Sequence, residues 1–326
     1  MGKCVVLGKG DAQAVKNGNP VRRMNLLESW RVYRRARRTI RCHDCESISK
    51  APRAGMVVTD GIPYQVMHDG MKIRFGGYHG AWMAEIIRAL KGHHEPQEER
   101  IFHEVLKVMP HDAVMIEVGS FWAYYSLWFK RCVPNGRTYM LEPVQGKLQL
   151  GIDNFRLNDV EGVFINAFIG ASSSEESEFA DWDGSILRLP CIAIDDFLDK
   201  NKIEFLDILH ADIQGAELDM LEGARHSLAG KRIGYLFIST HGDKHERCLA
   251  AVRRAGYKMV VQHSIKESCS GDGLIVACSE HAPQISSLEI SKAEEYGKVR
   301  ENMSALVDLM RNKDHRRLWN AIRASS

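Results

Sequence analysis

The sequence has little net charge and no long apolar run. Its 326 residues include 44 Lys and Arg against 42 Asp and Glu, which gives a formal net charge of +2. So small an excess argues against nucleic acid as a partner, because such binding needs many basic contacts to phosphates. No apolar stretch is long enough to cross a bilayer, and the residues after Met1 lack the sustained apolar segment of a secretory signal. We therefore expect a soluble, cytoplasmic protein without a membrane partner.

Paired cysteine motifs are also scarce. The eight cysteines are scattered, and a chain of this length needs no disulfides to bury a core. Only Cys42-His43-Asp44-Cys45 has ligand-like spacing, and no second Cys-x-x-Cys or His pair completes a four-ligand zinc site. We therefore expect reduced thiols in this loop and no metal site.

Basic residues are concentrated between Arg22 and Arg41. Leu26, Leu27, Trp30 and Tyr33 fall at helical spacing there and arginines fill much of the rest, which predicts a basic amphipathic helix. Packing on the main domain or on another subunit is the favoured role of this helix. Binding of an anionic ligand or of a membrane surface is the alternative.

The middle of the chain alternates short apolar runs with helical stretches. The apolar runs cover residues 113–118, 138–141, 162–169, 208–211 and 234–239. This alternation predicts βαβ units in an α/β fold with a mostly parallel sheet, whose ligands lie at the carboxyl ends of the strands. Two later runs, 257–262 and 273–277, predict an antiparallel hairpin that completes the sheet.

These patterns divide the chain into three parts. We expect residues 1–55 to form a basic helical extension, residues 56–285 the α/β domain, and residues 286–326 a helical tail that covers the domain or a partner. Shorter helices are predicted from Trp82 to Leu90 and after Pro96. The two flanking helical segments make a homodimer a reasonable expectation.

The first chemical motif is the turn that follows residues 113–118. In Met115-Ile-Glu-Val-Gly-Ser-Phe-Trp-Ala-Tyr-Tyr-Ser126 a strand ends at Glu117-x-Gly119 and passes directly into a helix. A dinucleotide-binding turn has three glycines for close approach to a pyrophosphate, but here Gly119 stands alone and Ala123 takes the later small position. The turn argues against NAD or FAD and is compatible with S-adenosyl-L-methionine, which has no phosphates. An ordinary tight turn is the alternative.

The second motif is an acidic residue at the end of the next strand. Glu142 lies 23 residues beyond Gly119, near the spacing at which a carboxylate accepts hydrogen bonds from ribose hydroxyls. Pro143 would end the strand and hold the carboxylate at its tip. The order strand, glycine turn, helix, strand and acidic tip is more specific than any one of these features.

The third motif follows the strand at 208–211. Asp212 is expected at the strand tip, where such a fold presents residues to the group being transferred. Glu217 falls in the first turn of the next helix, where the helix dipole alone would also favour an acidic side chain. The sequence therefore favours a functional role for Asp212 and leaves that of Glu217 open.

The fourth motif is a histidine after the strand at 234–239. Aliphatic hydroxyls are weak acids, so their methylation needs a base that is effective near neutral pH, and His241 is the best-placed candidate. A structural histidine, or a metal ligand partnered by His245 or Asp212, is the alternative. Asp272, in a Gly-Asp-Gly turn, would orient His241 or contact the substrate.

Three hypotheses follow. In the first, His241 is the base, Asp212 positions the hydroxyl, and no metal is needed. In the second, Asp212 and Glu217, with or without His241, bind a divalent cation that lowers the pKa of the acceptor. In the third, the chain is a non-catalytic cofactor-binding scaffold whose basic helix docks an anionic partner.

The segment from about His93 to Ala277 resembles the FkbM family of methyltransferases. The matching motifs are Glu117-Val-Gly-Ser-Phe-Trp-Ala-Tyr-Tyr-Ser126, Glu142-Pro143, Asn154 and Asn158, Ile194-Asp195-Asp196-Phe197, and Asp212-Ile-Gln-Gly-Ala-Glu217. The departures are Ala123 in place of Gly, Gln214 in place of Glu, and Ser-Thr-His241 in place of Glu-x-His.

The resemblance implies a Rossmann-like class I methyltransferase with helical extensions at both ends, which uses S-adenosyl-L-methionine to methylate a hydroxyl of a small molecule, a natural product or a glycan. It also implies that His94-Glu95-Pro96-Gln97-Glu98 borders the cofactor pocket. Aromatic residues beside the turn would form walls of that pocket or pack within the helix. The expected catalytic residues are His241, Asp212 and Asp272, and the expected cofactor-binding residues are Glu95, Glu117, Gly119, Ser120, Phe121, Tyr125, Glu142, Pro143 and Asp212.

Overall fold

The computed structural model of the protein describes residues 5–7, 26–181, 184–293 and 313–324. The chain forms two compact units, each with β-structure of its own. Unit 1 comprises residues 1–8, 101–268 and 272–290, and unit 2 comprises residues 9–100, 269–271 and 291–326.

Unit 1 is built on one large sheet with the strand order β1-β7-β6-β5-β11-β12-β14-β13. Neighbours from β1 to β12 pair in parallel, whereas β14 pairs antiparallel with both β12 and β13. The predicted α/β architecture and its terminal antiparallel hairpin are therefore confirmed. The strands are β1 (Val5–Leu7), β5 (Val114–Val118), β6 (Arg137–Leu141), β7 (Val163–Ile165), β11 (Leu206–Ala211), β12 (Ile233–Thr240), β13 (Lys258–His263) and β14 (Gly273–Cys278).

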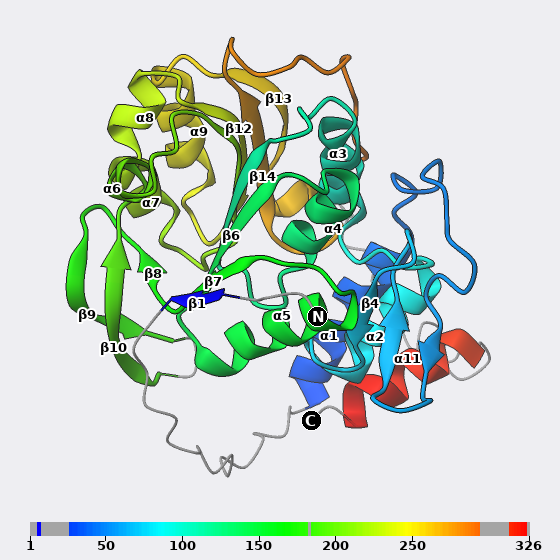
Figure 1. Cartoon of the computed structure of the whole chain (residues 1–326). Helices are drawn as coiled ribbons and strands as arrows, with labels where there is room; N and C mark the ends of the chain where they lie inside the picture. Colours follow the sequence, from blue (N-terminus) through cyan, green and yellow to red (C-terminus); the bar gives the residue numbers. More distant parts are fainter. Residues whose placement is uncertain (1–4, 8–25, 182–183, 294–312, 325–326) are drawn as a thin grey trace. The chain divides into compact units, whose positions relative to one another are not determined.

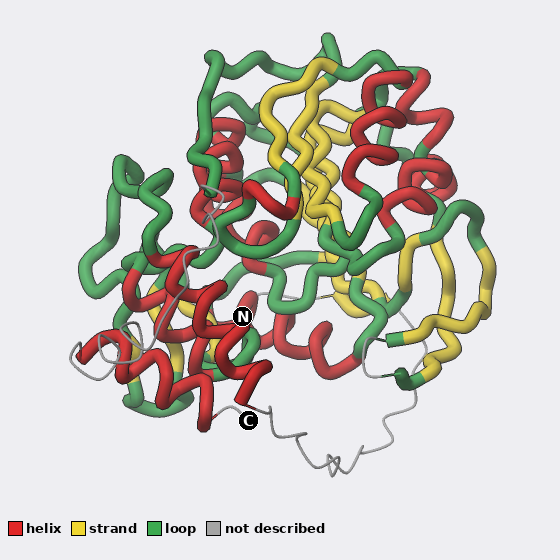
Figure 2. Tube along the Cα trace, turned by 180° about the vertical axis from the view of Figure 1, so that it is seen from behind, coloured by secondary structure: helices red, strands yellow, loops and turns green. Residues whose placement is uncertain are grey.

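Helices cover both faces of this sheet (Figures 1 and 2). One face packs in an apolar cluster against α6 (Ile194–Lys200), α7 (Glu217–Gly223), α8 (Arg225–Ala229) and α9 (His245–Arg254). The other face carries α4 (Tyr124–Cys132), α5 (Gln145–Leu157) and the unit 1 part of α3 (Pro96–Leu106). β5 and β11 are buried along their whole length, and both are mainly apolar, with Glu117, Asp207 and His210 as the polar exceptions.

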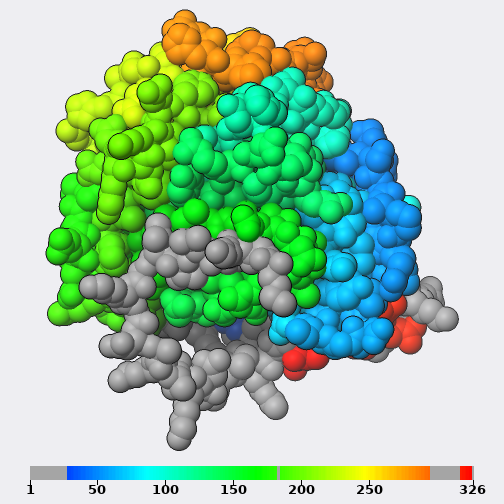
Figure 3. Space-filling model, viewed as in Figure 1, coloured from blue at the N-terminus to red at the C-terminus, as the bar shows by residue number. Residues whose placement is uncertain are grey.

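A smaller sheet with the order β8-β10-β9 accompanies the large one. Its strands are β8 (Phe168–Ile169), β9 (Ser174–Ala180) and β10 (Ile186–Ile192). The sequence predicted one strand over 162–169, but a tight turn in which Ala167 N donates to Ile165 O separates β7 from β8. The β9–β10 hairpin lies at the left edge of the view in Figure 3. β9 is exposed and mostly polar, and β10 is interrupted by Arg188 and Pro190, so hydrophobic patterning did not predict either strand.

In unit 2 three helices pack together. They are α1 (Leu26–Ile40), α2 (Ala81–Ala89) and α11 (Lys313–Ala324). Tyr33 of α1 is fully buried, and its ring and that of Trp30 meet Trp319 of α11 edge to face, at centroid distances of 5.8 and 6.2 Å. The predicted basic helix is therefore present, and it packs against α2 and α11.

Unit 2 also contains a three-stranded antiparallel sheet of β2 (Val57–Val58), β3 (Tyr64–Val66) and β4 (Lys72–Arg74). These strands pair with one another and not with the large sheet, so residues 56–100 group with unit 2. The expected domain start at residue 56 thus differs from this division, which falls after Arg100.

The predicted tail is seen only in part. Residues 286–293 are not helical, α11 includes Leu318, and the expected helical positions Leu306, Leu309 and Met310 lie outside the described residues. None of the helices in the described ranges combines the length and the apolar character needed to cross a membrane.

Candidate active site

The parallel strands of unit 1 bring the predicted site residues to one edge of the sheet. Val118 at the end of β5 pairs with Leu141 of β6 and with Ala211 of β11, and Ala211 pairs with Ile238 of β12. The residues that follow these strands therefore share the carboxyl edge, where parallel α/β sheets bind ligands. They include Gly119, Ser120, Glu142, Pro143, Asp212 and His241.

Gly119 is required by the backbone at this edge. Its φ is +72°, and a Cβ added there would lie 1.9 Å from the carbonyl oxygen of Asp212. Backbone atoms cannot move aside as a flexible side chain can, so only glycine lets the turn after β5 approach the loop after β11. Phe121 and Ala123 also have positive φ, 42° and 55°, before α4 begins. The single glycine of the motif thus serves close packing between two loops.

The Glu142 carboxylate is buried at the tip of β6 and is held by backbone amides. Phe121 N donates to Oε2 and Val144 N donates to Oε1, each at 3.0 Å. Burial raises the pKa of this carboxyl, and the two amide hydrogen bonds and the Lys147 ammonium act in the opposite direction. The Asn166 side chain donates to the carbonyl oxygens of Glu142 and Pro143, at 3.0 and 2.8 Å, and so fixes the loop.

Two further groups surround the turn after β5. Ser120 is buried, and its hydroxyl has no hydrogen-bond partner among the described residues. A buried hydroxyl in that state is a polar group that a ligand can satisfy. Lys147 lies 5.3 Å from the centre of the Phe121 ring and 3.5 Å from Asp181 Oδ1.

Glu117 and Tyr125 make structural contacts in the structure. Ser126 N donates to Glu117 Oε2 at 2.9 Å, so this buried carboxylate holds the first turn of α4. Burial raises its pKa, against the opposing charge of His210. The Tyr125 ring packs on His210 with a centroid distance of 4.1 Å and edge to face on Phe102. The cofactor contacts expected of Glu117 and Tyr125 stay predictions.

His241 lies at the centre of a group of polar side chains. Its Nδ1 is 2.6 Å from Glu217 Oε1, and its Nε2 is 3.3 Å from Asp212 Oδ1 and 3.4 Å from Asp272 Oδ1. Glu217 is fully buried, whereas the His241 side chain is 14% exposed. The Gln214 amide nitrogen lies 2.9 Å from Nε2 and donates to Asp212 Oδ1 at 3.0 Å. The sequence missed this contact because it follows from a backbone turn with φ +50° at Gln214.

This environment sets the proton affinity of His241. Burial by itself lowers the pKa of the imidazole, but the hydrogen bond to Glu217 and the charges of Asp212 and Asp272 outweigh it and raise the pKa to about 8. With Nδ1–H donating to Glu217, the neutral ring presents an unprotonated Nε2, which the Gln214 amide meets. The protonated ring instead donates from Nε2 to an aspartate. The three carboxylates therefore stabilise the imidazolium.

The positions of Asp212, Glu217 and His245 limit how these residues could bind a metal ion together with His241. Asp212 and Glu217 contact opposite nitrogens of the His241 ring, so one ion cannot use both carboxylates together with either nitrogen in this arrangement. The suggested partner His245 is used elsewhere, because its Nδ1 lies 2.8 Å from Thr240 Oγ1 and its Nε2 lies 3.1 Å from Gln262 Oε1. His245 is thus a structural residue.

The structure brings most of the predicted residues together in unit 1. Gly119 contacts the Asp212 loop, Glu142 bonds to Phe121, and Asp212, Asp272 and His241 form one cluster. Glu95 belongs to unit 2, so its expected place beside the cofactor stays a prediction.

Residues 107–259 match the family model described as Methyltransferase FkbM domain. Similar solved structures include precorrin-6y C5,15-methyltransferase from Geobacter metallireducens GS-15 (16% identical, covering 56% of this chain and 87% of that chain, TM-score 0.37). A second is M. capricolum TrmK in complex with S-adenosyl-homocysteine (14% identical, covering 69% of this chain and 94% of that chain, TM-score 0.37). A third is the N-terminal domain of human METTL16 in complex with SAH (14% identical, covering 56% of this chain and 70% of that chain, TM-score 0.36). Among curated proteins, none matches this sequence.

The family match agrees with the motifs at Glu117–Ser126, Glu142–Pro143 and Asp212–Glu217, all of which fall inside the matched segment. Residues 107–259 of this chain are a methyltransferase FkbM domain.

Proposed function

We propose that the protein is an S-adenosyl-L-methionine-dependent methyltransferase that methylates a hydroxyl of a small molecule, a natural product or a sugar, with His241 as the base. One observation carries the hydroxyl and base assignments. His241 Nδ1 is fixed by buried Glu217 while Nε2 faces Asp212 and Asp272 at the carboxyl edge of the sheet. The family assignment supports the cofactor.

The turn after β5 and the tip of β6 suit the adenosyl part of the cofactor. Each Glu142 oxygen accepts one backbone hydrogen bond and keeps a lone pair that can accept a ribose hydroxyl. Ser120 Oγ adds a buried group that lacks a partner among the described residues. The turn has one glycine where a diphosphate cradle would need more, so these residues fit a nucleoside without phosphates.

The His241 cluster suits removal of a proton from the acceptor. Bound S-adenosyl-L-methionine supplies a methyl carbon on a cationic sulfur. This methyl group would pass to the acceptor oxygen while the sulfur keeps the electron pair of the broken bond, and His241 Nε2 would take the hydroxyl proton. The imidazolium so formed lies within 3.4 Å of carboxylate oxygens of Asp212, Asp272 and Glu217, which stabilise its charge. The acceptor would replace the Gln214 amide at Nε2.

Asp212 has a second role in this proposal. It lies beside the turn at Gly119 and also contacts His241 Nε2, so it stands between the two parts of the site. Its carboxylate can accept a hydrogen bond from the acceptor and align it for in-line transfer. Alignment of this kind is a major source of rate enhancement for reactions between two bound groups.

The test is incubation of the purified chain with methyl-labelled S-adenosyl-L-methionine and an extract of the producing organism, followed by mass spectrometry of the labelled products. We expect one labelled product in which a methyl ether has replaced a hydroxyl. A His241→Asn variant should give little of it, and a Glu222→Gln variant, changed at an exposed position of α7, should give the wild-type amount.

Label on nitrogen or carbon would contradict the hydroxyl assignment. Activity lost in chelator and restored by a divalent cation would favour the metal-dependent alternative over His241. Absence of transfer to any acceptor, with cofactor binding intact, would favour the scaffold alternative.

A further inference from the structure

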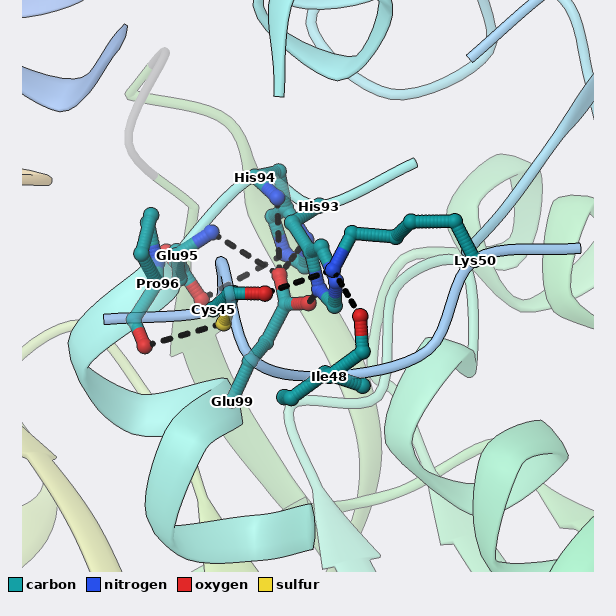
Figure 4. Close-up of polar contacts among 8 residues, drawn as sticks. All are labelled: Cys45, Ile48, Lys50, His93, His94, Glu95, Pro96 and Glu99. Atoms are coloured by element: carbon teal, nitrogen blue, oxygen red, sulfur yellow. Dashed lines mark hydrogen bonds and ion pairs between the residues drawn. The ribbon is translucent and has the colours of Figure 1, made fainter. Parts of the chain in front are cut away.

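Unit 2 contains a buried cluster of a cysteine, a histidine and a glutamate, contributed by two distant segments of the chain. Cys45, His93 and Glu99 each offer a potential ligand atom, and these three atoms all lie within 4.8 Å of one another. Each side chain is at least nine-tenths buried. Figure 4 shows Glu99 between the Cys45 loop and the imidazoles of His93 and His94. None of these residues belongs to the His241 cluster of unit 1.

His93 supplies an independent sign of a missing ligand. Its Nδ1 contacts Glu99 Oε2, but its Nε2 is buried and makes no hydrogen bond to any described residue. Burying a polar nitrogen without a partner is unfavourable, and native proteins rarely leave one in that state. A metal ion or an ordered water molecule would satisfy it.

The surrounding backbone holds Glu99 in place. His94 N and Glu95 N donate to Glu99 Oε1 at 2.7 and 2.9 Å, and His94 Nδ1 lies 2.7 Å from the same atom. The imidazoles of His93 and His94 both contact the buried Glu99 carboxylate. Outer contacts of this kind orient the ligands of metal sites.

We propose that Cys45 Sγ, an imidazole nitrogen of His93 and a carboxylate oxygen of Glu99 bind one divalent transition-metal ion, with zinc as the ion that best suits this ligand set. Sulfur, imidazole and carboxylate are the three ligand types of protein zinc sites, at bond lengths of about 2.0–2.3 Å. Those lengths place tetrahedral ligands roughly 3.5 Å apart, so small side-chain movements would close the present spacing. Three protein ligands leave the fourth position to a water molecule or to Pro96 O, which lies 3.2 Å from Cys45 Sγ.

The charges around the cluster bear on binding. Zinc binds a cysteine as the thiolate, so metal binding at Cys45 releases the thiol proton. Lys50 is one of the cations near Cys45, and its ammonium is turned to the carbonyl oxygens of Cys45 and Ile48.

The first test is titration of the full-length, chelator-treated and reduced protein with Co²⁺ as a spectroscopic substitute for zinc. We expect one equivalent to bind with thiolate-to-cobalt charge-transfer absorption and strong visible bands of a tetrahedral ion. One equivalent of Zn²⁺ should then remove both signals. This readout is independent of methyl transfer, so it succeeds or fails separately from the proposed function. Wild-type protein without thiolate charge transfer would overturn the proposal.

Matched variants assign the ligands. Cys45→Ser should abolish the charge-transfer band, and His93→Gln should weaken binding at least about 100-fold, since even outer-contact changes weaken metal sites by 10–100-fold. Cys42→Ser, in the same loop, and Cys132→Ser, at an exposed cysteine, should leave the spectrum unchanged. A band that survives in Cys45→Ser, or that disappears in Cys42→Ser, would overturn this ligand set. If a variant fails to fold, the wild-type spectrum decides.

Discussion

Two ends of the same sheet edge handle charge in different ways. At the tip of β6, Glu142 is buried, and each of its carboxylate oxygens accepts a hydrogen bond from a backbone amide. The backbone itself therefore fixes the position of this side chain. After β12, His241 is partly exposed and bonded to side chains alone, among three carboxylates and an amide. The first arrangement resists change and suits a constant grip on a ligand. The second stabilises either protonation state and suits a group that gains and loses a proton.

The comparison predicts that the two ends can be separated by mutation. The largest effect should come from His241→Asn, which removes the base and leaves the β6 tip intact. We expect the methyl-transfer rate on the identified acceptor to fall by roughly 10²–10⁴-fold. Single-turnover assays at saturating cofactor would measure it. A rate within about threefold of wild type would show that the acceptor loses its proton by another route.

A substitution at Gly119 should test the backbone packing at the carboxyl edge of the sheet, independently of the Glu142 and His241 side chains. In Gly119→Ala the added Cβ meets Asp212 O and the residue keeps a positive φ, so we expect a loss of more than about 2 kcal/mol in unfolding free energy. Gly146→Ala is the matched control, since nothing lies within 4 Å of its added Cβ and it sits in α5. That change should be neutral or stabilise by about 0.5–1 kcal/mol. Urea unfolding of both variants measures the difference, and equal effects would contradict the account.

The pH dependence of the rate tests the carboxylates around His241. Because the neutral ring is the active base, the rate should rise with pH and level off above the His241 pKa of about 8. Glu217→Gln removes a group that raises this pKa, so the rise should move to lower pH. Glu222→Gln, at an exposed position of the same helix, should leave the profile unchanged. If Glu217→Gln leaves the pH–rate profile unchanged, the group whose titration controls the rate is not His241.

The smallest expected effect is the contribution of His241 protonation to the unfolding free energy. The folded pKa of His241, about 8, lies above its ordinary value of 6.5, so protonation stabilises the fold. That contribution is fully present below the ordinary value and is lost as the pH rises through about 8, and it amounts to at most about 2 kcal/mol. Unfolding in urea at about pH 6 and pH 9 should show the loss in wild type, and a smaller loss in His241→Asn. An equal loss in both proteins would assign it to other groups.

The sequence predicted the parts of the site that depend on strand ends. Gly119, Glu142, Asp212 and His241 each follow an apolar run, and parallel strands carry such residues to one edge. Spacing alone therefore located them. The role of Glu217 was left open because helix-end stabilisation explains an acidic residue equally well, and only its contact with His241 Nδ1 distinguishes the two.

Other features were beyond sequence patterns for physical reasons. β9 is polar and mostly exposed, β10 contains Pro190, which argues against a strand, and β2 to β4 are only two or three residues long. From sequence, Cys45 could be considered only together with Cys42, because the two have Cys-x-x-Cys spacing. The residues that lie beside Cys45 in the structure, His93 and Glu99, are about 50 positions further along the chain. Clusters assembled from distant segments leave no local spacing to detect.

The most direct test of the central claim is calorimetric titration of S-adenosyl-homocysteine into wild type, Glu142→Ala and His241→Asn, with exposed Glu176→Ala as a control. The account predicts that Glu142→Ala weakens binding by roughly 100-fold, through loss of charge-assisted hydrogen bonds to the ribose, and that His241→Asn and Glu176→Ala bind like wild type. Wild-type protein that gives no heat with this ligand or with S-adenosyl-L-methionine, but binds a nicotinamide or flavin nucleotide, would contradict the account, as would unchanged affinity in Glu142→Ala.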